Sequence, residues 1–362
     1  MIKYLGSKRA LVPVLGAIAS ASGATGAVDL FTGTTRVAQE FKRRGLAVVA
    51  NDIASYAKVM ADCYIRTDAD LVDLAEVRSA LARLQSLPGK RGYFTETFCE
   101  RSRYFQPKNG AKVDAIRDAI EAEYAGSWMR PILLTALMLA ADRVDSTTGV
   151  QMAYLKQWAP RASNDLELRL PELLPGPGRS EQSDALALAR RLPRTPLIYL
   201  DPPYNQHRYF TNYHIWETLM KWDAPQTYGI ACKRVDCREE ATKSVYNRKG
   251  EMVGELRRLL HAIDAELAVV SYNDESWITP EDMTATLREA GFEEVRLLSF
   301  DSKRYVGAQI GIHNLAGQRV GRVSHLRNLE YLFLAGPGEL VAACAAGALS
   351  AARPATGSAI CG

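Results

Sequence analysis

The stretch Leu197-Ile198-Tyr199-Leu200-Asp201-Pro202-Pro203-Tyr204-Asn205 decides how the rest of the chain is interpreted. Its four apolar residues are too few for a helix, and prolines precede them, so the run predicts a buried strand. Two consecutive prolines cannot continue a β-ladder, so the chain must leave the sheet there. Asp201 and Tyr204 then lie at the carboxyl end of a strand, where open α/β sheets bind their ligands. A Pro-Pro turn with a capping Asp explains the same residues, and the remaining sequence must decide.

The composition is that of an ordinary folded protein. The 362 residues, 47% hydrophobic and 24% charged, suffice for one large domain or two smaller ones. The net charge of +4 permits a polyanionic partner but supports one only weakly. No secretory signal is evident, and the longest apolar run, 131–141, is too short to span a bilayer. We therefore expect a soluble, cytoplasmic protein with no membrane partner.

The cysteines and histidines do not predict a metal site. Six cysteines and five histidines are scattered along the chain, and no histidine pair lies near Cys232 and Cys237. We interpret the cysteines as free structural thiols and expect no bound metal.

A strand, a glycine-bearing turn, a helix and a second strand follow one another near the N-terminus. The strands are expected at 27–30 and 46–50, and each is associated with an acid, Asp29 or Asp52. In nucleotide-binding α/β folds the first turn packs against the cofactor, and the second acid binds ribose hydroxyls. One glycine here, Gly33, instead of three disfavours a dinucleotide and fits S-adenosylmethionine better. The first crossover of any α/β protein is a competing interpretation.

The alternation of strands and helices is interrupted between about residues 62 and 180. Helices are expected within 71–87, 113–120 and 131–144. The side chains between them could bind nucleic acid or could simply solvate helix surfaces. They are Arg91, Tyr93, Phe94, Arg101, Arg103, Tyr104, Phe105, Lys108 and Asn109.

The later part of the chain returns to strands. They are expected at 266–272, 294–300 and 331–334, after an aromatic and basic segment at 206–249. The residues from 336 to 362 are rich in alanine, glycine and serine, which predicts a flexible tail or a weak helix.

The order of these motifs resembles that of the DNA adenine-N6 methyltransferases. Tyr4-Leu5-Gly6-Ser7-Lys8 is followed by Asp29-Leu30-Phe31-Thr32-Gly33, Asn51-Asp52, a long insertion and Asp201-Pro202-Pro203-Tyr204. The resemblance implies an α/β fold with a mixed, mostly parallel seven-stranded Rossmann-like methyltransferase sheet. It also implies a catalytic domain at 1–61 and 181–335, a mainly helical target-recognition insertion at 62–180, and a flexible tail at 336–362.

The resemblance assigns roles to individual residues. The catalytic tetrapeptide is matched by Asp201, Pro202, Pro203 and Tyr204. The positions that match cofactor-binding residues are Tyr4, Lys8, Asp29, Phe31, Gly33, Asp52 and Asp184. The family's acid at Asp52 holds the ribose hydroxyls of S-adenosylmethionine, and the acid at Asp184 contacts its adenine. An N-cap is an equally good explanation of Asp184.

Methylation of an amino group explains why such residues would be needed. The adenine N6 nitrogen is a poor nucleophile because its lone pair is conjugated with the ring. Asp201 could accept a hydrogen bond from one N–H and the Pro202 carbonyl from the other, and the carboxylate would offset positive charge developing on nitrogen. The prolines fix the direction of that carbonyl. Tyr204 offers a ring on which a base extruded from the duplex can stack.

These features together predict a site-specific adenine methyltransferase that acts on double-stranded DNA with S-adenosylmethionine. The resemblance implies a bacterial or phage restriction–modification system, with a cognate restriction endonuclease as partner and a location near the nucleoid. Methylation of cytosine N4 or of RNA on the same fold is an alternative, and so is a catalytically silent DNA-binding protein. The intact segments 29–33 and 201–204 disfavour the silent protein.

Overall fold

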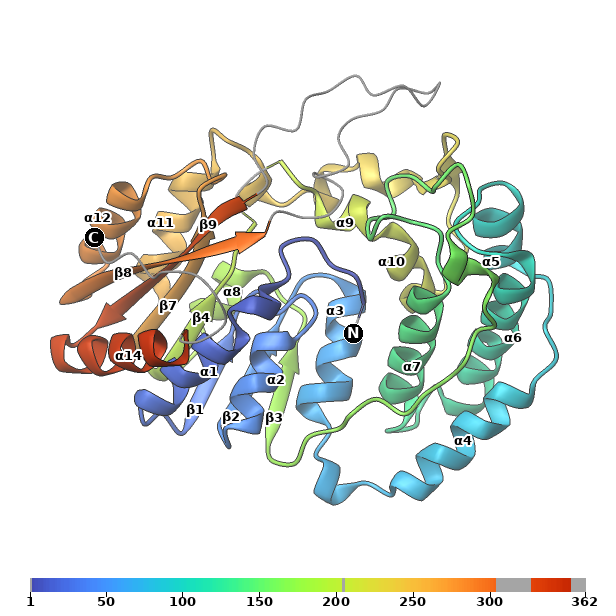
Figure 1. Ribbon diagram of the computed structural model, residues 1–362, viewed down its shortest axis with the longest axis horizontal. Coiled ribbons are helices and arrows are strands. Elements are labelled where there is room, and N and C mark those ends of the chain that lie inside the picture. Colours follow the sequence, from blue (N-terminus) through green and yellow to red (C-terminus); the bar gives the residue numbers. More distant parts are fainter. Residues whose placement is uncertain (1, 204–205, 304–326, 353–362) are drawn as a thin grey trace. The chain divides into compact units, whose positions relative to one another are not determined.

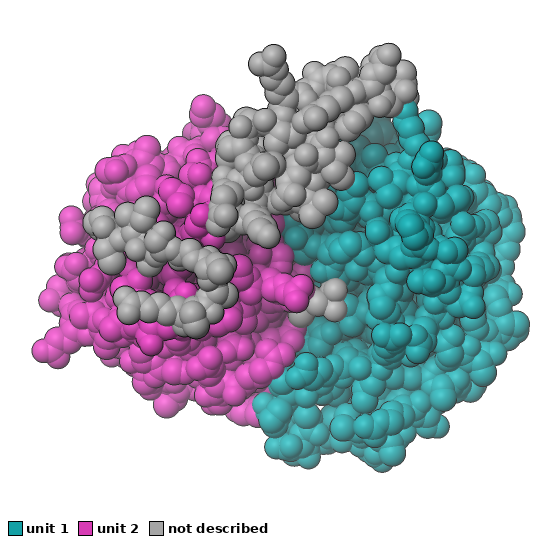
Figure 2. Space-filling model, in the orientation of Figure 1, with its two compact units in different colours: residues 1–5, 54–175, 208–243 teal, residues 6–53, 176–207, 244–362 magenta. Residues whose placement is uncertain are grey.

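The chain forms two compact units, each assembled from three separate segments (Figure 2). The structure is a computed structural model that describes residues 2–203, 206–303 and 327–352. Unit 1 consists of residues 1–5, 54–175 and 208–243, and unit 2 of residues 6–53, 176–207 and 244–362. The sequence placed the insertion at 62–180 alone. Residues 208–243 join its helices because α10 (His214–Lys221) packs against α3 (Ser55–Ala61) and α7 (Arg130–Arg143).

Unit 2 is built on a seven-stranded sheet with the order β3-β2-β1-β4-β7-β9-β8. Only β9 runs antiparallel to its neighbours, and the other pairs are parallel. This confirms the predicted mixed, mostly parallel Rossmann-like sheet. The strands are β1 (Gly26–Asp29), β2 (Ala47–Asn51), β3 (Gly178–Glu181), β4 (Thr195–Leu200), β7 (Ala265–Asn273), β8 (Glu294–Lys303) and β9 (Arg327–Gly336).

Helices cover both faces of this sheet (Figure 1). On β4, Tyr199 meets Phe41 of α2 edge to face, whereas Ile198 and Leu200 join the core formed with the helices of the other face. Alternate residues of one strand therefore enter two different cores. One face carries α1 (Val12–Ala21), α2 (Arg36–Arg43) and α14 (Gly338–Ala351). The other carries α8 (Ala185–Ala189), α11 (Met252–Ala262) and α12 (Pro280–Glu289).

The segment after β9 is a packed helix. Val341, Cys344, Ala345 and Ala348 of α14 are at most 1% exposed, and the helix lies against α1. Its small side chains allow the two helices to approach closely, which gives an alanine-rich segment a buried face. The expectation of a flexible tail from residue 336 is therefore wrong for residues 338–351. Residues 353–362 of the predicted tail lie outside the described residues.

Unit 1 is mainly helical and is organised around α7. Residues 131–142 of this helix are all buried, and α3, α4, α6 and α10 pack against it. A helix that is apolar on every side belongs in a core, which explains the long apolar run. Besides α3 and α10, its described α-helices include α4 (Leu74–Ser86), α5 (Tyr93–Thr95), α6 (Pro107–Tyr124) and α9 (Tyr209–Asn212). Its hairpin consists of β5 (Thr227–Tyr228) and β6 (Lys233–Arg234).

None of the helices in the described ranges combines the length and apolar composition that crossing a bilayer requires. The cysteines within those ranges, at positions 63, 99, 232, 237 and 344, are buried free thiols, in agreement with the sequence interpretation. Cys361 lies outside the described residues.

The aromatic residues proposed to contact nucleic acid in the insertion are mostly core residues. Phe94, Tyr104 and Phe105 are at most 1% exposed. Phe94 contacts Phe105 with ring centroids 5.2 Å apart. These three rings are therefore not available to stack on a nucleic acid, and that part of the prediction is wrong. Arg101 is exposed.

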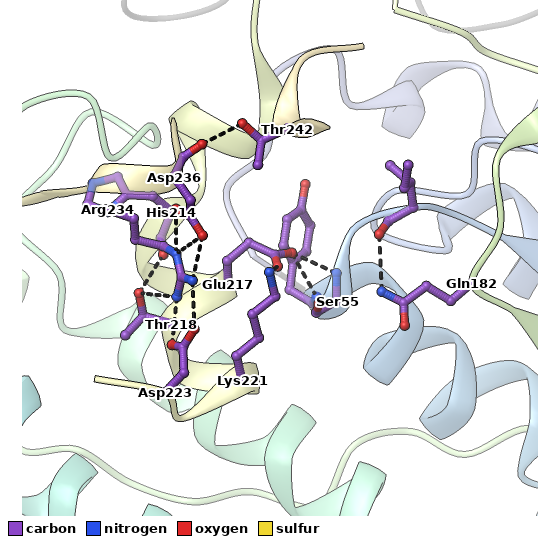
Figure 3. A network of polar contacts seen from close by, with 12 residues as sticks. Ser55, Gln182, His214, Glu217, Thr218, Lys221, Asp223, Arg234, Asp236 and Thr242 are labelled. Carbon is purple, nitrogen blue, oxygen red and sulfur yellow. Dashed lines mark hydrogen bonds and ion pairs between the residues drawn. The ribbon is translucent and has the colours of Figure 1, made fainter. Parts of the chain in front are cut away.

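A buried arginine joins the hairpin of unit 1 to α10 (Figure 3). The Arg234 guanidinium donates at 2.7 Å to each Asp223 carboxylate oxygen and at 2.8 and 3.0 Å to the two oxygens of Asp236. It also donates to Thr218 Oγ1 at 3.3 Å. We call Arg234, Asp223 and Asp236 the arginine centre. In it, one buried cation satisfies two carboxylates through directed hydrogen bonds.

Candidate active site

Three acidic residues of unit 2 lie where neighbouring parallel strands end. β1 pairs with β2 on one side and β4 on the other, and Asp29 is opposite Ala50 and Tyr199 in the two registers. Asp52 follows β2 directly, and Asp201 follows β4. The three predicted acids are thus brought to the carboxyl edge of the sheet, where α/β folds bind ligands.

Asp201 is paired with a buried lysine. The Lys8 ammonium lies 3.2 Å from Asp201 Oδ1 and 3.2 Å from Oε2 of Glu330 in β9. The Lys8 side chain is only 6% exposed. Burial raises the pKa of Asp201 to about 6, an effect that Lys8 opposes and Glu330 reinforces. We call Lys8, Asp201 and Glu330 the lysine centre; the sequence had indicated its first two members and missed the third.

Asp29 shapes the turn between β1 and α2. Its Oδ2 accepts hydrogen bonds from Thr32 Oγ1 at 2.9 Å and from the Ala38 N–H at 3.2 Å. Its Oδ1 is buried and has no hydrogen-bond partner among the described residues. Burial raises the pKa of Asp29 to about 7, and the Thr32 hydrogen bond opposes this shift. The carboxyl is thus poised to change charge near neutral pH.

The glycine turn is tied to the second acid. Gly33 has a φ of 49°, in the region that favours glycine, and its N–H donates to Asp52 Oδ2 at 2.9 Å. Ile53, directly after Asp52, is 67% exposed. Phe31, in the same turn, contacts Tyr246 edge to face at 5.4 Å. The turn and the residues after β2 thus bring together a fixed carboxylate, an aromatic ring and an exposed apolar side chain.

Asn51 joins the ends of three strands, a role that the sequence did not reveal. Its Nδ2 donates to the carbonyls of Leu30 and Ser183, each at 3.1 Å, and its Oδ1 accepts from the Ser183 N–H at 3.1 Å. The next residue, Asp184, is exposed and accepts from the Ala187 N–H at 2.9 Å as the N-cap of α8. This confirms the capping explanation, and contact with cofactor adenine stays a prediction.

Tyr4 belongs to unit 1 and lies in an aromatic cluster. Its ring stacks on Tyr213 at 4.7 Å and on Tyr209 at 5.3 Å, and its hydroxyl is 3.1 Å from that of Tyr56. The N–H of Leu5 donates to the Tyr213 hydroxyl at 2.6 Å. The first two residues of the N-terminal motif, Tyr4 and Leu5, are therefore anchored within unit 1 by rings from the segment after the tetrapeptide.

The structure describes the rest of the predicted catalytic tetrapeptide in part. Pro202 is buried and Pro203 is half-buried, whereas Tyr204 lies outside the described residues. Further along, Asn247 Nδ2 donates to the His207 carbonyl at 3.1 Å, which ties the chain after the tetrapeptide to the segment before α11. The structure thus places Asp201 and both prolines directly after β4.

Comparison with known proteins points to one family. Residues 4–286 match the model of the D12 class N6 adenine-specific DNA methyltransferases. The chain is 30% identical over 311 residues to the modification methylase StsI of Streptococcus sanguinis, covering 80% of this chain and 46% of that protein. It is 32% identical over 257 residues to the type II methyltransferase M.NlaIII of Neisseria lactamica, covering 68% and 74% respectively. With M.CviAII of Paramecium bursaria Chlorella virus 1 the identity is 28% over 282 residues, covering 74% and 81%.

The length of the match differs among these relatives. The chain spans about half the length of StsI and of the type II methyltransferase M.FokI of Planomicrobium okeanokoites, 46% and 45% respectively. Within the chain, the family match includes Lys8 and Asp201 of the lysine centre and ends before Glu330.

Proposed function

Because the chain belongs to the D12 class N6 adenine-specific DNA methyltransferases, we propose that it methylates the N6 amino group of adenine at a defined site in double-stranded DNA. The observation that carries this proposal is Asp201, held by Lys8 at the carboxyl end of β4 and followed by two prolines. Methyltransferases of this family use S-adenosylmethionine as methyl donor.

The carboxyl edge of unit 2 has groups that fit S-adenosylmethionine. Asp52 is half-buried and oriented by Gly33, which suits hydrogen bonds to ribose hydroxyls. Asp29 carries a buried oxygen without a hydrogen-bond partner among the described residues, and a cationic ligand would favour its charged form. Phe31 supplies an aromatic surface. The remaining proposed cofactor contacts are Tyr4, Lys8 and Asp184. When bound, the cofactor supplies a methyl group already activated on a sulfonium.

Asp201 and Pro202 would hold the amino group of the target base. The ionised carboxylate accepts one N–H and the Pro202 carbonyl the other, so that the nitrogen lone pair turns out of conjugation with the ring. Lys8 favours the charged form of Asp201 against the effect of burial. The carboxylate then offsets positive charge as it develops on N6. Stacking of the extruded base on Tyr204 stays part of the proposal.

We propose that unit 1, which contains most of the predicted insertion, recognises the DNA. With Phe94, Tyr104 and Phe105 in the core, its contacts to the duplex would come from exposed cations such as Arg101 and Arg208 on phosphates and from a few base-edge contacts. StsI is named a modification methylase, and M.NlaIII a type II methyltransferase. A restriction endonuclease of the same specificity is therefore the proposed partner, and the bacterial cytoplasm, where such DNA lies, the proposed location.

Product analysis tests this function. Purified protein is incubated with methyl-labelled S-adenosylmethionine and unmethylated duplex DNA, and the nucleosides are identified by mass spectrometry. We expect N6-methyladenine, and sequencing of modified bases should place it at one short site. N4-methylcytosine, or methylation of RNA in place of DNA, would overturn the assignment of the base or the substrate. DNA binding without any transfer would favour the catalytically silent protein.

A further inference from the structure

Glu330 is the member of the lysine centre that the proposed mechanism does not use. It lies on β9, opposite Asn273 of β7 and Phe300 of β8, and its side chain is 16% exposed. Its Oε2 accepts a hydrogen bond from the Lys8 ammonium at 3.2 Å, across 322 residues of sequence. The same ammonium lies 3.2 Å from Asp201 Oδ1. A strand outside the family match thus supplies a second carboxylate to the catalytic edge.

The three groups do not balance in charge. One ammonium lies beside two carboxylates. All three side chains are at most 20% exposed, so solvent screens the interactions between their charges little. Glu330 acts on Asp201 in two ways. Its negative charge repels that of Asp201, and it draws the Lys8 charge toward itself. Both effects make ionised Asp201 less stable than it would be beside Lys8 alone.

We infer that Glu330 is a positioning residue for methyl transfer. By binding Lys8, it fixes the ammonium between the two carboxylates and limits how far that charge neutralises Asp201. Asp201 then keeps its hydrogen-bonding capacity for the target amino group instead of closing into a tight ion pair with Lys8. The inference rests on the proposed function, because it concerns the carboxylate that would hold the base.

The consequence is a defined pH dependence. Asp201 must be ionised to accept the N–H, so the rate should rise with pH through its pKa of about 6. Replacing Glu330 by Gln removes the repulsion and frees Lys8, so Asp201 ionises at lower pH. The charged or titratable groups that act on Asp201 come from five elements: Lys8 before α1, Glu330 on β9, Asp29 on β1, Tyr199 on β4 and Tyr272 on β7.

Single-turnover rates with saturating S-adenosylmethionine and duplex DNA test this, measured on the full chain on both sides of the Asp201 pKa of about 6. For Glu330→Gln we expect the acidic limb of the profile to move down by roughly half to one pH unit, which makes the rate below the limb about threefold to tenfold higher relative to its plateau. Glu294→Gln is the matched control. It removes the same charge from an exposed position at the start of β8, whereas Glu330 is opposite Phe300 toward the other end of that strand. The acidic limb of the Glu294→Gln profile should therefore stay in place.

The possible outcomes separate the interpretations. A Glu330→Gln limb that coincides with that of Glu294→Gln, or moves to higher pH, overturns the inference. A purely structural role would lower the rate at every pH without moving the limb, and this also overturns it. If Glu330→Gln does not fold, Glu330→Asp keeps the charge on a shorter side chain and should give a limb between the wild-type and lower positions. Absence of methylation by the wild-type chain defeats the proposed function itself, whereas methylation with an unmoved limb defeats only the inference.

Discussion

The arginine centre of unit 1 and the lysine centre of unit 2 each hold one buried cation against two carboxylates. Arg234 binds both partners through hydrogen bonds, with the two shortest at 2.7 Å. Lys8 stands 3.2 Å from each of its two carboxylates. Burial opposes ionisation of Asp223, yet the hydrogen bonds from Arg234 hold its pKa below the usual value. Burial dominates at Asp201 and raises its pKa to about 6.

The chemistry of the two cations explains this difference. A guanidinium is planar and offers five donors in a fixed fork, so it can satisfy two carboxylates at once. An ammonium is a compact point charge whose effect is divided between its neighbours. The arginine centre is therefore suited to fixing the hairpin on α10. The lysine centre leaves one carboxylate only partly neutralised, which suits a group that must bind a substrate.

The largest effect is expected where the lysine centre meets the substrate. Asp201→Ala removes the acceptor for the amino group and the charge that stabilises the transition state, so transfer should fall by about 1000-fold. The measurement is the single-turnover rate on duplex DNA, with DNA binding measured in parallel. Binding should persist, because the variant leaves unit 1 intact. An Asp201→Ala protein with nearly wild-type transfer would refute the proposed mechanism.

The next effect should appear in stability, at the arginine centre. Arg234→Met leaves Asp223 and Asp236 without their cation, so the free energy of unfolding should fall by about 3 kcal/mol. Urea unfolding followed by circular dichroism measures it.

Arg238→Met is the matched control for this prediction. Arg238 is exposed, follows Arg234 closely in sequence and lies over the Tyr228 ring at 3.8 Å. Its loss should lower the free energy of unfolding by less than about 1 kcal/mol. Equal losses in the two variants would show that Arg234 is no more than a surface cation.

The smallest expected effect is a difference between Asp201 and Asp223 in how the stability contributed by each changes with pH. The pKa of Asp201 is raised from 3.8 to about 6 in the folded protein. Between these values the folded state retains a proton that the unfolded chain has released, so this group lowers stability as pH rises. Asp201→Asn removes that dependence and should stabilise the protein by about 1–2 kcal/mol above the pKa of about 6, but not near pH 4.

Asp223 should behave in the opposite way, because its folded-state pKa is lowered. Its contribution is present above the unfolded-state pKa and is lost as pH falls through the lower folded-state value. Asp223→Asn should therefore destabilise the protein at neutral pH, with the difference shrinking in acid. Urea unfolding of both variants at neutral and acidic pH gives the comparison, and the same sign for both would contradict it.

Motifs at strand ends could be predicted from the sequence because each is defined by a short run of consecutive residues. The apolar run before Asp201 and the single glycine of the first turn sufficed to predict β4, β1 and the edge at which their acids meet. β3 was missed because Gly178-Arg179-Ser180-Glu181 is short and polar, as an edge strand can be. Asn51 and Asp52 were seen as a pair, but the contacts of Asn51 with Leu30 and Ser183 require the folded chain.

The wrong predictions arose where the burial of side chains had to be inferred from composition. Aromatic and basic residues alternate between positions 91 and 109 in a manner typical of a binding surface, yet three of the rings are buried, and two of them pack against His214 and Trp216 of α10. The alanine-rich composition after residue 336 predicts a flexible tail or a weak helix. Its small side chains stabilise the helix through packing only when α1 lies beside them. Glu330 carried no local signal at all, since its role depends on the register of β9 against β7.

The distance in sequence between Lys8 and Glu330 has a consequence for biosynthesis. A growing polypeptide is extended by about 5–20 residues per second, so roughly 15–65 s pass between the synthesis of these two residues, which are 322 positions apart. Once Asp201 has been synthesised, the growing chain can place Lys8 near it, but the Lys8 charge cannot be shared with Glu330 until β9 exists. The carboxyl edge of unit 2 therefore reaches its final electrostatic state only after β9 has been translated and inserted between β7 and β8.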